Sequence, residues 1–158
     1  MGVGACPGNA AENLAEGVYT VLNISGQKYL NVDNALTYNG SNVVIWDSDT
    51  DVNSQWRVTR AGEACVYRLQ DMNSGLYLSV NNARKDEYAD VVIFDDGAAA
   101  GSLWRLKAAG ADDVFTLQDT NSGKYLSVFR GLSANGSTVV ICSFPGAKAS
   151  QWFITKIA

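Results

Sequence analysis

Three aspartates alternate with other residues in the stretch VVIWDSDTDVNSQW. Asp47, Asp49 and Asp51 match the first three ligand positions of an EF-hand calcium loop. That loop also requires a glycine at its sharp turn and a glutamate at its end, whereas this chain has Val52 and Val58 there. We therefore expect these side chains to serve a polar organic ligand, with calcium binding as the less favoured alternative.

The residues needed for most enzyme chemistry are missing. The chain contains no histidine, so histidine cannot act as a general base, activate a nucleophile or bind zinc. Cys142 follows the apolar run STVVI, which predicts a small buried residue and not a reactive thiol. Cys6 and Cys65 complete a set without C-x-x-C spacing, for which we expect reduced thiols and no disulfide framework. The sequence predicts a protein that is not an enzyme and has no metal centre and no cofactor.

The distribution of charge and the length of the apolar runs argue against two classes of partner. The formal net charge is -4 and the 12 Lys and Arg residues are scattered, so no basic stripe could neutralise a run of phosphates. We expect no nucleic acid partner. The apolar runs have the length of strands, far below the ~20 residues of a membrane helix, so we expect no membrane insertion.

The first residues show neither the basic region nor the unbroken apolar core of a secretory signal peptide. This predicts a cytoplasmic or non-classically secreted protein.

A period of 48 residues organises the chain. The residues that recur are the tryptophans Trp56, Trp104 and Trp152, the tyrosines Tyr29, Tyr77 and Tyr125, and the VVI segments at 43–45, 91–93 and 139–141. No gap is needed to align them. The chain therefore reads as a single domain of three repeats, residues 15–62, 63–110 and 111–158, which we call the first, second and third repeat, preceded by an N-terminal extension, residues 1–14.

Each repeat predicts four short strands, because β-branched and aromatic runs alternate with clusters of Gly, Asn, Ser and Asp. In the first repeat these runs are VYTVLN, YLNV, VVIW and QWRVTR. Asn-Gly in TYNGSN and SANGST predicts a hairpin between the second and third strands. Twelve strands in three equal repeats predict an all-β fold, the β-trefoil, because propellers typically need at least four blades. The expected core consists of the three tryptophans and of Val21, Leu69, Leu117, Leu30, Leu78, Leu126, Val58, Leu106 and Ile154.

Residues 15–158 resemble the ricin-B-like lectin family. The resemblance rests on the closing motifs NSQWRV, GSLWRL and ASQWFI and on the hairpin starts NSGLYLSV and NSGKYLSV. It implies a carbohydrate-binding β-trefoil with one site per repeat. Each family site combines a polar residue after the second strand, an aromatic residue at the end of the third strand and an asparagine before the closing tryptophan.

Carried over position by position, the resemblance predicts two candidate sugar sites. The predicted residues are Asn31, Asp33, Asn34, Trp46, Asp47 and Asn53 in the first repeat, and Ser79, Asn81, Phe94 and Asp95 in the second. The third repeat has Ser127, Cys142 and Ala149 at these positions, so we expect it to bind sugar poorly, with Phe129 or Phe144 as substitute rings.

The resemblance implies galactose or N-acetylgalactosamine as the type of sugar, and glycans or glycoproteins as partners. Many family members hold galactose with an acidic residue at the position of Asn31, Ser79 and Ser127, so here Asp33 or Asp47 would have to supply the acceptor. Lectins gain avidity from several sites, which predicts a homodimer. Two alternatives stay open, a β-trefoil protease inhibitor acting through an exposed loop and a targeting module of a larger toxin or glycosidase.

Overall fold

The computed structural model of the protein describes residues 14–158, which form twelve β-strands, four in each repeat. The strands of the first repeat are β1 (Gly17–Asn23), β2 (Tyr29–Val32), β3 (Val43–Trp46) and β4 (Trp56–Arg60). The strands of the second repeat are β5 (Val66–Asp71), β6 (Tyr77–Val80), β7 (Val91–Phe94) and β8 (Trp104–Ala108). The strands of the third repeat are β9 (Val114–Asp119), β10 (Tyr125–Val128), β11 (Val139–Cys142) and β12 (Trp152–Lys156). The predicted β-trefoil is confirmed, while the predicted N-terminal extension lies outside the described residues except for its last residue.

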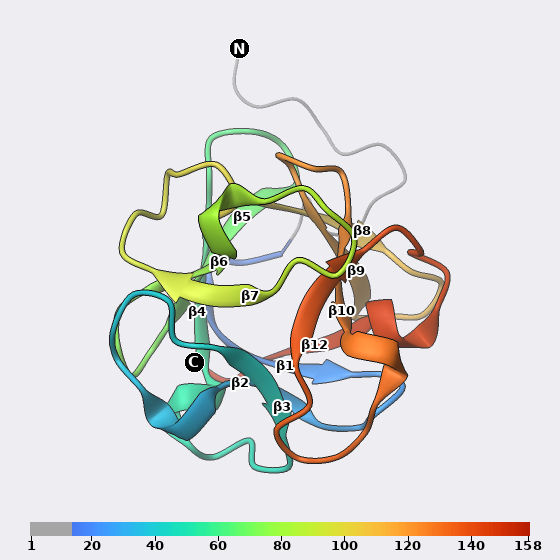
Figure 1. Cartoon of the computed structure of the whole chain (residues 1–158), viewed down its shortest axis with the longest axis horizontal. Helices are drawn as coiled ribbons and strands as arrows, with labels where there is room; N and C mark the ends of the chain where they lie inside the picture. Colours follow the sequence, from blue (N-terminus) through green and yellow to red (C-terminus); the bar gives the residue numbers. More distant parts are fainter. Residues whose placement is uncertain (1–13) are drawn as a thin grey trace.

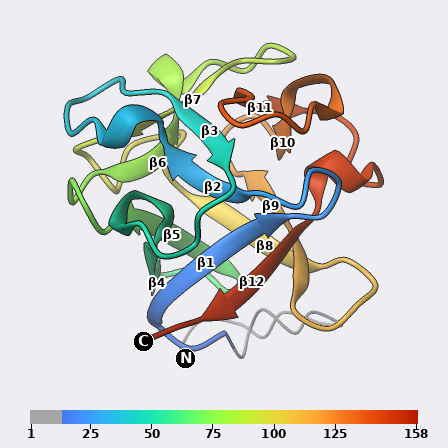
Figure 2. The same cartoon turned by 90° about the horizontal axis from the view of Figure 1, so that it is seen from below.

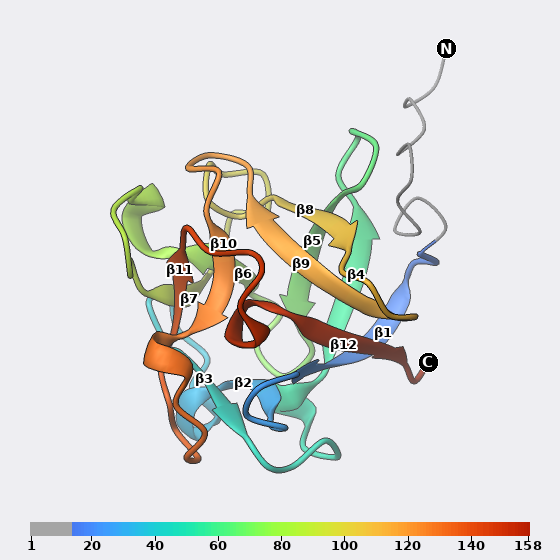
Figure 3. The same cartoon turned by 90° about the vertical axis from the view of Figure 1, so that its right-hand side faces the viewer.

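The first and last strands of the three repeats form a closed barrel. Antiparallel pairing runs from β1 to β4, β5, β8, β9 and β12, and β12 pairs with β1 again. Figure 2 shows β1 and β12 side by side where the ring closes. The remaining strands form the hairpins β2–β3, β6–β7 and β10–β11, which lie beyond one end of the barrel in Figure 3. The barrel therefore has no free edge, and the hairpins cover one end of it.

Alternation along the strands builds the core. In β4, Trp56 and Val58 are buried whereas Arg57 between them is exposed, as expected for side chains that alternate between two faces. All predicted core positions are buried. The three tryptophans are fully buried, and each indole Nε1 donates a hydrogen bond of 3.0 Å to the carbonyl oxygen of a leucine in the second strand of the same repeat. Each tryptophan thereby ties a barrel strand to a hairpin.

Each hairpin also reaches the neighbouring repeat. The tip residues Gly40, Tyr88 and Gly136 have φ of 89°, 66° and 87°, which confirms the reversals predicted at the two Asn-Gly sequences. Their amides donate to carbonyl oxygens of the next repeat, Gly40 to Ile93 and Tyr88 to Ile141. The third hairpin returns to the first repeat through the bond from Gly136 to Ile45. Figure 1 shows the resulting ring of hairpins around the centre of the molecule.

The cysteines differ from the prediction of reduced thiols. Cys142 is free and buried, as predicted. Cys65 is disulfide-bonded, so the prediction is wrong for this residue. Cys65 lies in the turn before β5, where it has a left-handed φ of 66°. The spacing of cysteines in the sequence does not show which thiols the folded chain brings together. Cys6 lies outside the described residues.

Among residues 14–158, no helix has the length and apolar character needed to cross a membrane.

Candidate functional site

Two short 3-10 turns frame the candidate site of the first repeat. η2 (Asp33–Ala35) follows β2, and η3 (Val52–Ser54) precedes β4. Asn34 and Ala35 have left-handed φ of 53° and 52°. Asparagine adopts this conformation at little cost, whereas alanine pays about 1 kcal/mol or more. The two consecutive left-handed residues reverse the chain after β2 and bring Asn34 to the edge of a pocket.

This pocket has a volume of about 430 Å³ and combines one aromatic ring with polar groups. Its lining residues are Asn31, Asn34, Ala35, Trp46, Asp51, Val52 and Asn53. Trp46 at the end of β3 is 39% exposed, which is unusual for a tryptophan in this fold because the other three are fully buried. The indole ring is thus available to a ligand, next to the carboxylate of Asp51 and the amide of Asn34.

A hydrogen-bonded floor holds the pocket together. Asn53 Nδ2 donates to the carbonyl oxygen of Val32 at 2.9 Å and approaches Asn31 Oδ1 at 3.4 Å. Asn31 is buried, and its Nδ2 donates to Ser54 Oγ at 2.6 Å. No described residue donates to Oδ1 of Asn53, so this oxygen can accept a hydrogen bond from a ligand. The side chain of Asn31 mainly stabilises the pocket floor, whereas the side-chain oxygen of Asn53 is available to a ligand.

The serine of this floor recurs in every repeat. Ser102 Oγ donates to Ser79 Oγ at 3.0 Å, and Ser150 Oγ donates to Ser127 Oγ at 3.1 Å. Ser54, Ser102 and Ser150 are all fully buried. They were not among the predicted site residues, although they recur at the same spacing of 48 residues. They anchor the segment before the closing strand, and with it the residues that line each pocket.

The second repeat has an equivalent and more apolar pocket of about 500 Å³. Phe94, which is 37% exposed, takes the place of Trp46. The lining also includes Ser79 and Asn81, the alanines Ala99 and Ala100, and Asn39 and Gly40 from the hairpin of the first repeat. Gly101 stands where the first repeat has Asn53, with φ of 92° and with Val80 O only 3.3 Å from where a Cβ would lie. An asparagine would not fit there without strain, so this pocket lacks the amide of the first.

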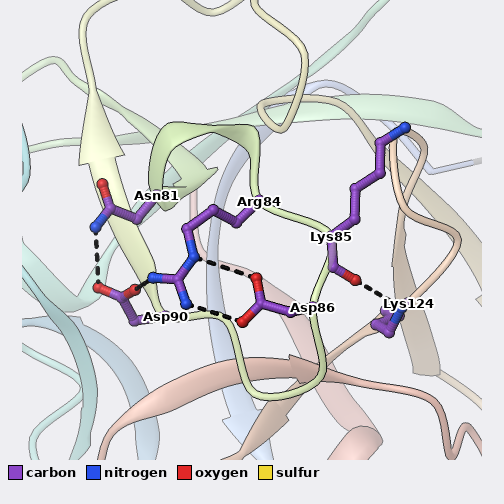
Figure 4. A network of polar contacts seen from close by, with 6 residues as sticks. All are labelled: Asn81, Arg84, Lys85, Asp86, Asp90 and Lys124. Atoms are coloured by element: carbon purple, nitrogen blue, oxygen red, sulfur yellow. Dashed lines mark hydrogen bonds and ion pairs between the residues drawn. The ribbon is translucent and has the colours of Figure 1, made fainter.

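Asn81, which lines the second pocket, belongs to a polar network (Figure 4). Asn81 lies in η4 (Asn81–Ala83), and its Nδ2 donates to Asp90 Oδ2 at 3.3 Å. Arg84 pairs with both Asp86 at 2.9 Å and Asp90 at 3.3 Å. The Arg84 guanidinium hydrogen bond lowers the pKa of the Asp86 carboxyl. One of the two N–H donors of the Asn81 amide is therefore engaged, while its second N–H and its oxygen are left for a ligand.

The structure brings together seven of the ten predicted site residues. Asn31, Asn34, Trp46 and Asn53 line the first pocket, and Ser79, Asn81 and Phe94 line the second. Asp33, Asp47 and Asp95 line neither pocket. Asp51 also lines the first pocket, although it was not among the predicted sugar-site residues.

The three alternating aspartates point to different partners. Asp47 Oδ2 accepts a hydrogen bond of 3.1 Å from Asn135 Nδ2 in the hairpin of the third repeat. Asp49 lies near Tyr29, whose pKa is raised by burial and further by this carboxylate. Asp51 faces the pocket. Within residues 14–158, no group of three or more Asp, Glu, Cys or His side chains is arranged to hold a metal ion.

In the third repeat, the polar residues at two equivalent positions are buried and contact the segment before β12. Ser127 is buried and its Oγ donates to Ala149 O at 3.1 Å, while Cys142 is buried with its Sγ 3.4 Å from Ser150 Oγ. No ring stands at the end of β11. The geometry of the first two pockets is thus not repeated here.

Comparisons with known proteins agree with this architecture. A sequence profile described as "Ricin-type beta-trefoil lectin domain-like" matches residues 9–94 and 100–158. No curated protein shows a significant match. Among solved structures, the designed threefold-symmetric protein ThreeFoil has a TM-score of 0.85 and 30% identity, over 90% of this chain and 100% of that chain. The Rhizoctonia solani agglutinin has a TM-score of 0.81 and 20% identity, over 91% and 97% of the two chains. The Macrolepiota procera ricin B-like lectin, solved with lactose, has a TM-score of 0.75 and 14% identity, over 91% and 99%.

Proposed function

The chain belongs to the family of ricin-type β-trefoil lectin domains, and on this premise we propose that it is a non-catalytic lectin that binds glycans through shallow sites in its first and second repeats. The sugar is of the galactose or N-acetylgalactosamine type. The similarity to a lectin solved with lactose, a galactose-containing sugar, supports this choice.

One observation carries the proposal. At equivalent positions of two repeats, an exposed aromatic ring stands beside a pocket lined with amides, Trp46 in the first and Phe94 in the second. A pyranose presents an apolar face of C–H bonds that packs on such a ring, while its hydroxyls need fixed polar partners. A protease inhibitor would not require equivalent rings in two repeats.

The first repeat is the stronger of the two sites. Asp51 and Oδ1 of Asn53 accept hydrogen bonds from sugar hydroxyls, and Asn34 supplies a further amide. Hydrogen bonds to a charged acceptor contribute about 1.5–3 kcal/mol, roughly twice those to a neutral one. The second pocket has alanines in place of Asp51 and Val52, and it binds sugar more weakly.

Two sites on one chain also allow avidity toward branched or clustered glycans. Linking sites raises the effective concentration for the second contact, and a homodimer would double their number. We include the homodimer in the proposal. Measuring the molar mass in solution by light scattering tests whether the protein is a homodimer.

A glycan array tests the proposed function. The wild type should bind terminal galactosides with or without a calcium chelator. A Trp46→Ala/Phe94→Ala double variant should lose this binding, while Phe144→Ala, which removes a ring that is 62% exposed outside both pockets, should keep it. Absence of binding to every neutral glycan would refute the proposal and would direct attention to a panel of proteases. Loss of binding on chelation would instead assign the acidic loop to calcium.

A further inference from the structure

The third repeat differs from the other two in charge. Residues 120–158 contain no aspartate or glutamate. Their basic residues are Lys124, Arg130, Lys148 and Lys156. In a chain with a formal net charge of -4, this segment is a local cationic region. Local positive charge attracts anions even when the whole protein is negative, because salt screens charges beyond about 8 Å.

Two of these basic residues occupy positions that line the pockets of the other repeats. Arg130 corresponds to Asn34 and Asn82, both of which line a pocket. Lys148 corresponds to Val52 and Ala100, which also line the two pockets. Arg130 and Lys148 therefore occupy backbone positions whose equivalents in the first two repeats line a pocket.

The backbone geometry supports this equivalence. Arg130 lies in η5 (Phe129–Gly131) with φ of 54°, matching 53° at Asn34 and 56° at Asn82. η5 packs against η6 (Lys148–Ser150), and Figure 1 shows the two turns next to each other. Two basic residues thus stand on neighbouring turns, an arrangement that would suit one anionic group.

An aromatic surface accompanies the two cations, although Cys142 replaces the ring of the first two repeats. Tyr88, at the hairpin tip of the second repeat, is 49% exposed and is held in the third repeat by its backbone bond of 2.8 Å to Ile141. Its ring meets Phe129 edge to face at 5.4 Å between centroids. The Arg130 guanidinium carbon lies 5.1 Å from the centroid of Phe129. The hairpin of the second repeat thus adds Tyr88 to Phe129, while the third repeat has no ring at the end of β11.

The guanidinium of Arg130 remains available to a ligand. No described residue forms an ion pair with it. Glu87, the acidic neighbour of Tyr88 in the hairpin of the second repeat, accepts hydrogen bonds from both the backbone amide and the hydroxyl of Ser143. A planar guanidinium stacked on a ring keeps its N–H groups free for two parallel bonds to a carboxylate or sulfate.

We propose that the third repeat is a site for an anionic sugar, with Arg130 and Lys148 binding the carboxylate or sulfate group and Tyr88 and Phe129 packing on the sugar ring. The inference rests on the proposed function in that the ligand is a glycan. It goes further by giving this repeat a ligand class of its own. The chain would then bind neutral sugars in its first two repeats and acidic sugars in its third.

Binding measurements with defined oligosaccharides test the inference. The probes are matched glycans that end in galactose, a sialic acid, glucuronic acid or a sulfated galactose, each at about 50 and 200 mM salt. Arg130→Asn and Lys148→Ala install residues that the sister repeats carry, so both variants should fold. Lys107→Ala on β8 is the matched control, because it removes the same charge from an exposed barrel position.

We expect the wild type to bind at least one acidic glycan more tightly than its neutral counterpart, more so at low salt. Arg130→Asn should weaken acidic binding by at least tenfold and leave galactoside binding unchanged, while Lys107→Ala should change neither. The sialylated, uronic and sulfated probes tell which anionic group is recognised. Equal affinity of wild type and Arg130→Asn for the acidic glycans, or an equal loss in Lys107→Ala, would overturn the inference.

The outcomes separate this inference from the proposed function. Galactoside binding without any preference for acidic glycans would overturn the inference alone. Acidic binding that depends on Arg130, without any neutral binding, would support the inference and refute the neutral sites of the first two repeats.

Discussion

Trp46 should dominate both the affinity of the first site and its optical signal. Trp56, Trp104 and Trp152 are fully buried, so Trp46 is the one tryptophan of the chain that a sugar can touch. Ligand binding should shift tryptophan emission to the blue and protect it from a soluble quencher. Trp46→Phe should keep a stacking ring while removing that optical response.

The size of the effect follows from the exposed area. A tryptophan side chain of roughly 250 Å² that is 39% exposed presents about 100 Å². Covering half to all of it at about 25 cal/mol per Å² contributes about 1–2.5 kcal/mol. Trp46→Ala should therefore weaken galactoside binding by about five- to sixtyfold, since each 1.4 kcal/mol is a factor of ten. Trp46→Phe should cost less than about 1 kcal/mol, because it retains an apolar ring.

Calorimetry gives the affinity, and emission spectra with acrylamide quenching give the location. A similar blue shift in Trp46→Phe would place the sugar near another tryptophan and refute the reasoning. So would an unchanged affinity in Trp46→Ala. Thermal unfolding of both variants serves as the control, because an exposed side chain should change stability by less than about 1 kcal/mol.

Three further predictions concern stability and the pocket floor. Trp152→Phe should lower the free energy of unfolding by about 2–4 kcal/mol, because packing and the hydrogen bond to Leu126 O are lost. Denaturant titration should give similar values for the equivalent tryptophan variants of the other two repeats. Asn53→Ala should weaken galactoside binding in calorimetry while costing about 1–2 kcal/mol of stability, because it removes the bond to Val32 O and the longer bond to Asn31 Oδ1. An unchanged affinity would contradict its part in the site. Burial raises the pKa of Asp71 above 3.8 despite hydrogen bonds from Ser74 and Asn73, so its protonated form favours folding and that contribution fades as pH rises through the raised pKa. Asp71→Asn, which has a natural counterpart in Asn23 of the first repeat, should flatten the stability profile above about pH 4 in melts at several pH values; an unaltered slope would contradict this assignment.

The repeat made the fold predictable from the sequence. A 48-residue period with identical tryptophans leaves few architectures, since three equivalent wedges must bury the same residues around one axis. Alternation within each run then indicated the inward side chains, and the buried positions agree. The candidate site was predictable only for residues that lie in the same repeat as their ring, such as Trp46 with Asn34 and Asn53.

The sequence by itself determined the repeat, the strands, the core and the two rings at the ends of β3 and β7, because these depend on local patterns that recur every 48 residues. Tertiary structure alone decided that Asp51 and not Asp47 faces the first pocket, that Cys65 is disulfide-bonded, and that Asn39 and Gly40 from the hairpin of the first repeat line the second pocket. The placement of Tyr88 against Phe129 is of this kind. The reason is physical: backbone pairing between hairpins and left-handed turns set where these side chains point, and such contacts join residues far apart in the sequence.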